Sequence, residues 1–201
     1  MLDVMRMRVQ GHRPREVEAA GLPEAGVLIP VTCVHDQPEI ILTLRSKRLS
    51  THSGEVAFPG GRRDPGDIDL CQTALRETHE EIGLPPERVE VIGPMNSLVS
   101  RFGIKVTPYV GIVPDVFELQ PNRFEIEEVF RVPVSFFMED QREMTHRIDY
   151  EGRSWYVPSY RYNGFKIWGL TALMLAELMN VGFQANIPLT TPYDPDRKQE
   201  Q

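Results

Sequence analysis

Three glutamates close together in the sequence are the residues best suited to do chemistry. Glu77, Glu80 and Glu81 belong to the segment 69–82, whose apolar residues recur at helical spacing. On a helical wheel the three carboxylates share an arc of roughly 100°. The opposite side of this helix, which can pack on a sheet, carries Cys71, Leu75, Thr78 and Ile82.

Such a cluster of carboxylates has two interpretations. Like charges at these spacings destabilise an isolated helix by about 0.2–0.5 kcal/mol per pair, so a solvated acidic face is one interpretation. A site for a hard cation is the other, because Mg²⁺ and Mn²⁺ prefer carboxylate oxygens. The surroundings favour the cation site: Arg76 adjoins Glu77, Asp64 and Asp67 lie upstream, and two glycines precede them, where backbone can approach a metal or phosphate closely.

The segment from Gly61 to Leu84 resembles the signature of the Nudix hydrolase superfamily, G-x5-E-x7-R-E-U-x-E-E-x-G-U, where U is a bulky aliphatic residue. Asp67 replaces the first glutamate, eight residues instead of seven separate it from Arg76, and Thr78 replaces an aliphatic residue. The resemblance implies a Nudix-like α/β/α sandwich, in the α/β or α+β class, with a central mixed sheet. It also implies metal-dependent hydrolysis of a pyrophosphate bond in a nucleoside diphosphate derivative.

The resemblance also implies roles for single residues. Mg²⁺ or Mn²⁺ is expected to be the cofactor, and Arg76 is expected to orient Glu77 through a charge-assisted hydrogen bond. For the general base, Glu125 is preferred over Glu127 and Glu128 because its surroundings resemble an E-V-x-x-V-F-x-V-P-like segment of related enzymes; a merely solvated acidic turn is the alternative. The expected metal ligands are Glu77, Glu80, Glu81 and the Gly60 carbonyl.

A second motif, L-L-T-x-R-S-x3-R-x3-G-x3-F-P-G-G, is typical of Nudix enzymes that cleave coenzyme A. Residues 41–46, Gly54 and 58–61 resemble it, although Ser50 stands where the motif has a basic residue. The implied substrate is coenzyme A or acyl-coenzyme A, cleaved to 3′,5′-ADP and (acyl-)4′-phosphopantetheine. The candidate substrate-binding residues are Arg45, Ser46, Lys47, Arg48 and Gly61.

Two alternatives remain open at this point. One is a Nudix hydrolase of ADP-ribose, NADH or another nucleotide, against which only the Arg45-Ser46 motif argues. The other is a non-catalytic Nudix domain that senses a nucleotide; such domains usually lose the carboxylates of the signature, whereas Glu77, Glu80 and Glu81 are all present here.

The elements that must position these residues follow from periodicity and turn residues. The helix at 69–82 is expected to end at Gly83, and a second, apolar helix is expected at 169–181. Turns are expected at 35–38 and at Glu151-Gly152. Strands are expected at 25–34, 39–44, 56–58, 89–92, 95–99, 106–113, 129–133, 144–150 and 155–162.

Composition bounds the remaining choices. The 201 residues suggest one domain at 25–187, after an N-terminal extension at 1–24 that forms at most a short helix, and before a tail at 188–201 expected to be disordered. The net charge of −7 argues against nucleic-acid and membrane-surface partners. Two isolated cysteines and no apolar N-terminal segment predict a cytoplasmic protein. The aromatic residues at 155–162 favour packing in the core or in a dimer, so a homodimer stays open.

Overall fold

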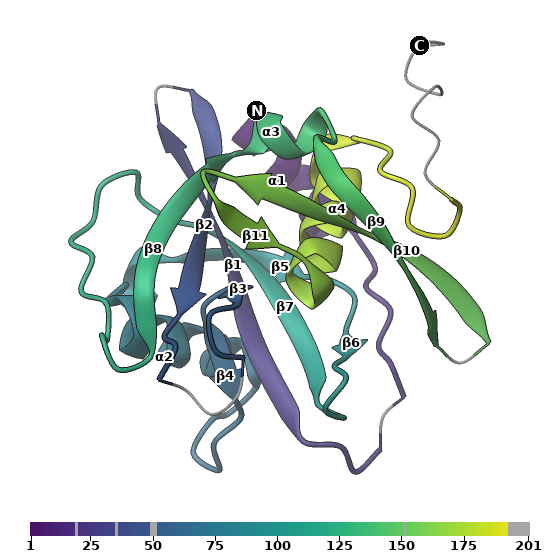
Figure 1. Ribbon diagram of the computed structural model, residues 1–201. Helices are drawn as coiled ribbons and strands as arrows, with labels where there is room; N and C mark the ends of the chain where they lie inside the picture. The colour runs from purple at the N-terminus through teal and green to yellow at the C-terminus, as the bar shows by residue number, and fades with distance from the viewer. Residues whose placement is uncertain (19, 35, 49–51, 151, 193–201) are drawn as a thin grey trace.

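A mixed sheet forms the centre of the computed structural model, which describes residues 1–18, 20–34, 36–48, 52–150 and 152–192 (Figure 1). Its path is β3-β2-β1-β7-β5, with β4 on β1, β6 on β7 and β8 on β2. The pair β1–β7 is parallel, and the other pairs in the described part of the sheet are antiparallel. The strands are β1 (Glu24–Val34), β2 (Gln37–Arg45), β3 (Val56–Ala57), β4 (Gly60–Arg62), β5 (Glu90–Pro94), β6 (Leu98–Val99), β7 (Lys105–Ile112) and β8 (Ile126–Pro133).

A second, smaller antiparallel sheet follows in the chain, with the order β11-β10-β9. It contains β9 (Arg142–Tyr150), β10 (Arg153–Tyr162) and β11 (Phe165–Ile167), and its β9–β10 hairpin extends from the body at the lower right of Figure 1. The helices are α1 (Leu2–Gly11), α2 (Leu70–Ile82), α3 (Val134–Met138), α4 (Gly169–Phe183) and the single 3-10 turn η1 (Pro86–Arg88). Among the described residues no helix is long and apolar enough to cross a membrane.

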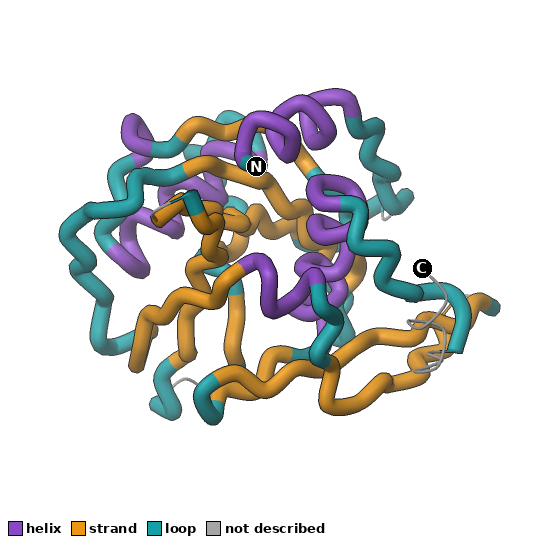
Figure 2. The backbone as a smooth tube through the Cα atoms, turned by 90° about the horizontal axis from the view of Figure 1, so that it is seen from above, coloured by secondary structure: helices purple, strands orange, loops and turns teal. Residues whose placement is uncertain are grey.

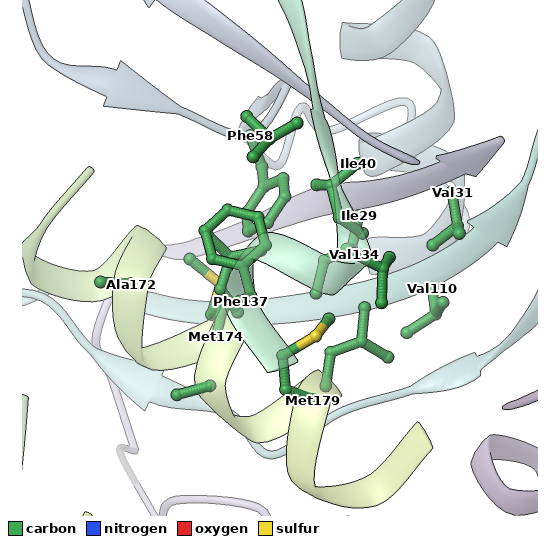
Figure 3. Close-up of a cluster of buried hydrophobic side chains, with 14 of the residues drawn as sticks. Ile29, Val31, Ile40, Phe58, Val110, Val134, Phe137, Ala172, Met174 and Met179 are labelled. Atoms are coloured by element: carbon green, nitrogen blue, oxygen red, sulfur yellow. The ribbon is translucent and has the colours of Figure 1, made fainter. Parts of the chain in front are cut away.

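The main sheet is covered on both faces. Alternate residues of each strand point to opposite sides, so each strand contributes to both cores. On one face Leu28 and Ile41 pack with Ala74 and Ile82 of α2. On the other face β1, β2 and β7 contribute side chains that pack with α4, among them Ile29, Val31, Ile40 and Val110, which are labelled in Figure 3. Viewed from above, α4 lies on the side of the strands opposite α2 (Figure 2). The arrangement is the α/β/α sandwich with a central mixed sheet that the sequence predicts.

The N-terminal helix α1 packs into the larger core cluster. Met5 and Val9 are buried there, and the Arg8 guanidinium donates a hydrogen bond to the Gly182 carbonyl of α4 at 3.0 Å. At the other end, the Leu189 carbonyl accepts a hydrogen bond from the Tyr156 N–H at 2.8 Å. The division into an extension at 1–24, a domain at 25–187 and a tail at 188–201 stays a prediction, and residues 193–201 of that tail lie outside the described part.

Most of the predicted elements are present, with shifted ends. The helix predicted at 69–82 is α2, with Asp69 as its N-cap and Gly83 in the left-handed region at φ 77°. The predicted hairpin at 144–162 is confirmed by the antiparallel β9–β10 pair, although Glu151 of its turn lies outside the described residues, as does His35 of the turn at 35–38. Four of the described elements were not predicted: β4, η1, α3 and β11.

Candidate active site

Helix α2 lies unusually close to β1 because a glycine faces it. A Cβ placed on Gly26 would come within 2.1 Å of the Leu70 carbonyl oxygen and 3.1 Å of the Ala74 nitrogen. The helix begins where the Asp69 side chain accepts a hydrogen bond from the Gln72 N–H, which satisfies one of the free donors of the first turn. This close packing fixes the height and rotation of α2 over the sheet, and with them the direction of its carboxylates.

Glu81 is the most buried of the three glutamates, with only 2% of its surface exposed. Its Oε1 accepts a hydrogen bond from Arg45 Nη1 at 3.1 Å, and its Oε2 accepts one from the Gly60 N–H at 3.1 Å. Burial raises the pKa of Glu81 to about 7, while the Arg45 charge and the Gly60 N–H act in the opposite direction. The interpretation as a solvated acidic face is therefore wrong for this residue.

Glu77 lies directly against Gly61. A Cβ on Gly61 would stand 2.4 Å from Glu77 Cδ, so the space that a side chain would fill here is occupied by the carboxylate. The Glu77 side chain is 18% exposed, and burial raises its pKa, opposed by the hydrogen bond from Arg76. Glu80 is the outermost of the three, with 55% of its side chain exposed.

Arg76 connects these carboxylates to Asp67. Its Nη1 donates to Glu77 at 3.0 Å and to Glu80 at 3.2 Å, so the contact expected between Arg76 and Glu77 is present. Its Nε and Nη2 donate to the two oxygens of Asp67, each at 3.0 Å. The hydrogen bonds between the two side chains hold the pKa of Asp67 well below its usual range and raise the pKa of Arg76. Asp67 thus anchors the arginine that orients Glu77.

The loop before β8 brings Glu125 to the same region. The loop is tied to the end of α2, since the Asn122 N–H donates to the Glu81 carbonyl and the Glu125 N–H donates to the Asn122 carbonyl, each at 2.9 Å. Burial is the main cause of the raised pKa of Glu77 and Glu81, and the charge of Glu125 adds to it. Glu127 and Glu128 are exposed, whereas Glu125 is half-buried. The structure therefore favours Glu125 among the three candidates for the general base.

Asn122 positions Glu125 and was missed by the sequence reasoning. Its N–H donates to the Glu81 carbonyl at 2.9 Å, and its Nδ2 donates to Glu125 Oε1 at 3.4 Å. Its Oδ1 also accepts from the Phe124 N–H at 3.1 Å, an Asx-type turn. The dipeptide Pro121-Asn122 was the signal that could have identified this turn in the sequence.

The predicted substrate-binding segment 45–48 divides into two parts. The Arg45 guanidinium faces Glu81, and its buried Nε has no hydrogen-bond partner among the described residues. Ser46 is buried, and its Oγ accepts a hydrogen bond from the Arg48 N–H at 3.3 Å. Lys47 and Arg48 are exposed, and they line a pocket together with Ser46. Ser50, which departs from the second motif, lies outside the described residues.

The donor set fits a divalent cation. Glu77, Glu80 and Glu81 offer the hard oxygens that Mg²⁺ and Mn²⁺ prefer. Burial, together with repulsion from neighbouring carboxylates, disfavours the charged forms of Glu77 and Glu81, a cost that a cation would offset. Gly60 contacts Glu81 through its N–H. In the described part of the chain no three acidic, histidine or cysteine side chains stand at ligand spacing, and Glu81 and Glu77 are paired with Arg45 and Arg76.

Several known proteins resemble this chain in sequence or in fold. The NUDIX domain family matches residues 23–154. A protein named uncharacterized Nudix hydrolase NudL from Citrobacter koseri is 40% identical over 178 residues, covering 88% of this chain and 92% of that protein. Its namesake from Yersinia enterocolitica is 38% identical over 175 residues, covering 87% and 89%. The crystal structure of a MutT/nudix family protein from Enterococcus faecalis matches in fold, with a TM-score of 0.53 at 15% identity over 90% of this chain and 68% of that one.

Proposed function

Because this chain belongs to the Nudix hydrolase family and is a pyrophosphate hydrolase, we propose that its substrate is coenzyme A or an acyl-coenzyme A. The products would be 3′,5′-ADP and 4′-phosphopantetheine or its acyl form. One observation carries the proposal: the Arg45–Glu81 ion pair at 3.1 Å joins the motif typical of coenzyme A-cleaving enzymes to the carboxylates of α2. The segment proposed to select the substrate therefore adjoins the residues proposed to act on it.

The chain's own residues have distinct roles in this proposal. Nudix hydrolases generally use divalent metal ions, and Glu77, Glu80 and Glu81 would hold Mg²⁺ or Mn²⁺, with the Gly60 carbonyl as a further ligand. When bound, such a cation would neutralise charge on the pyrophosphate oxygens and would lower the pKa of the attacking water. Arg76, held by Asp67, keeps Glu77 in place through the hydrogen bonds described above. Glu125, held by Asn122, would accept the proton of the water.

Recognition of the substrate is assigned to the exposed part of segment 45–48. Lys47 and Arg48 would contact the 3′-phosphate of the ADP half, whereas Arg45, which the sequence motif also assigns to the substrate, would act mainly by holding Glu81. Ser46 would fix the turn through its hydrogen bond to the Arg48 N–H. Gly61 would leave room for the Glu77 carboxylate and for the close approach of a phosphate.

The substrate assignment is tested by a direct comparison of nucleotides. The purified chain is incubated with Mg²⁺ or Mn²⁺ and with coenzyme A, dephospho-coenzyme A, ADP-ribose or NADH, and the products are separated by chromatography. Coenzyme A should be hydrolysed much faster than the other three and should yield 3′,5′-ADP. Equal rates for coenzyme A and dephospho-coenzyme A, or a preference for ADP-ribose or NADH, would contradict the proposal.

The role of Glu81 is tested by the isosteric substitution Glu81→Gln. Loss of this carboxylate should lower kcat by about 100-fold or more, since charge stabilisation carries much of such catalysis. The fold should persist because the amide oxygen can still accept one of the two hydrogen bonds, as an unfolding midpoint would show. Glu87→Gln, at an exposed glutamate of η1, is the matched control and should keep full activity. Wild-type turnover of Glu81→Gln at saturating Mg²⁺ would refute the role.

A further inference from the structure

A pocket of about 310 Å³ lies beside the candidate active site and has an excess of positive charge. Its volume is at the lower end of the range for small-molecule sites, roughly 300–1,000 Å³. Three of its lining side chains are cationic and one is anionic, although the whole chain has a net charge of −7. Its described lining consists of Ser46, Lys47, Arg48, Arg123, Ile126 and Glu127. A local excess of cations in an acidic protein indicates a site for an anion.

Two loops and the start of β8 form this pocket, and both loops are tied to the carboxylate cluster. The Ser46 N–H donates to the Glu125 carbonyl at 2.7 Å, which joins the loop after β2 to the loop before β8. Ser46 directly follows Arg45, the partner of Glu81. The second loop is anchored to the end of α2, where the Gln120 N–H donates to the Ile82 carbonyl at 3.0 Å. An anion in the pocket would therefore lie next to the reacting groups in a fixed relation to them.

Arg123 supplies the cation that faces Lys47 and Arg48 from the second loop. Its Nη1 donates to the Glu127 carbonyl at 2.8 Å, which holds the guanidinium at the wall of the pocket. A guanidinium has several N–H donors, so one such bond leaves others available for a ligand. Its planar fork suits the oxygens of a phosphate monoester, which can accept two parallel hydrogen bonds.

We propose that Arg123 joins Lys47 and Arg48 to bind the 3′-phosphate monoester of the substrate and thereby determines the preference for coenzyme A over its dephosphorylated form. This inference rests on the proposed function and deepens it. The sequence motif does not include Arg123, which lies far from it in the chain; only the folded pocket brings the three cations together. Arg123 is thus a specificity-determining residue and takes no part in bond cleavage.

The test compares two substrates that differ only in the 3′-phosphate. Arg123→Ala should raise KM for coenzyme A by about tenfold, because it removes a charge-assisted hydrogen bond, and should leave kcat and the KM for dephospho-coenzyme A nearly unchanged. Calorimetry should show a matching loss of affinity for 3′,5′-ADP and little change for 5′-AMP. Arg88→Ala is the matched control, since Arg88 is also an exposed arginine with one hydrogen bond to a backbone carbonyl, that of Val116 at 3.3 Å.

A second variant should shift the preference in the opposite direction. Glu127→Gln removes the one carboxylate of the pocket lining and should strengthen binding of 3′,5′-ADP relative to 5′-AMP. Equal effects of Arg123→Ala on both substrates, or no effect on either, would overturn the inference while the proposed function stands. If the wild-type chain does not hydrolyse coenzyme A, the proposed function fails, and the binding of 3′,5′-ADP against 5′-AMP still decides whether the pocket recognises a 3′-phosphate.

Discussion

The substitution Asp67→Asn tests whether Asp67 acts by anchoring Arg76 or by binding a metal. Both oxygens of Asp67 are engaged: Oδ1 accepts from Arg76 Nε, and Oδ2 accepts from Arg76 Nη2, from Thr73 Oγ1 at 2.9 Å and from the Asp64 N–H at 2.9 Å. The side-chain amide of asparagine has one oxygen that accepts and one NH2 group that only donates. Whichever way this amide is turned, at least one of its N–H donors faces another donor, and the guanidinium loses the counter-charge that binds it through two hydrogen bonds.

The size of the effect follows from these contacts. A hydrogen bond to a charged group contributes about 1.5–3 kcal/mol, and the Asp67 side chain is only 5% exposed, so solvent replaces it poorly. We expect the free energy of unfolding to fall by about 3 kcal/mol. We also expect kcat to fall by about 10- to 100-fold, as is typical when a residue that orients a functional group is lost. Part of the stability difference should disappear as the pH falls below about 4, where Asp67, whose pKa is lowered by folding, begins to lose its contribution.

Urea unfolding and steady-state kinetics at several Mg²⁺ concentrations measure both effects. Asp64→Asn is the matched control: Asp64 lies 3.7 Å from the same guanidinium, but its side chain is 67% exposed, so its ion pair should contribute between 0 and about 1 kcal/mol. Unchanged stability in Asp67→Asn would refute the anchoring role. Full recovery of kcat at high Mg²⁺ would show instead that Asp67 is a metal ligand.

Two further predictions concern single residues elsewhere. Gly61→Ala should displace the Glu77 carboxylate, because the new Cβ would stand 2.4 Å from Glu77 Cδ, and should lower kcat by about 100-fold; Gly66→Ala, whose Cβ would meet nothing within 4 Å, should retain wild-type kinetics. Burial raises the pKa of Glu177 to about 7. The folded protein therefore binds this proton more tightly than the unfolded chain, and the contribution of Glu177 should lower the free energy of unfolding by about 3 kcal/mol as the pH rises from about 4.5 to 7. Glu177→Gln should flatten that decline in urea unfolding measured across this range, and an unchanged slope would contradict the assignment.

Helix α2 and the long strands β1 and β7 could be predicted because local sequence determines them. Asp69 and Gly83 mark the ends of α2, and the apolar runs of β1 and β7 are long enough to specify strands. Helix α3 could not be predicted in this way, since its sequence Val-Ser-Phe-Phe-Met favours a strand, and its helical form accompanies the complete burial of Val134 and Phe137. Strand β4 begins with two glycines, which carry no strand signal, and it exists because β1 pairs with it.

The candidate site could be predicted for residues of α2 and less well for their partners. A helical wheel brings Glu77, Glu80 and Glu81 to one face, but it has no information about segments that pack on that face from elsewhere. It therefore could not predict that Arg45 and the Gly60 N–H would bury Glu81. The unusual spacing of Asp67 to Arg76 left the role of Asp67 open, and the paired hydrogen bonds between them now indicate one.

The parallel pairing of β1 with β7 also bears on how the protein is made. Parallel neighbours need a long crossover connection, and here that connection contains α2 with its glutamates. During synthesis β1 cannot complete its pairing with β7 until residue 112 has left the ribosome. Until then one edge of β1, a very apolar strand, has no hydrogen-bonded neighbour. We expect α2 to gain its final position only when this long-range pair closes, so the apolar surface of β1 is exposed to aggregation until late in folding.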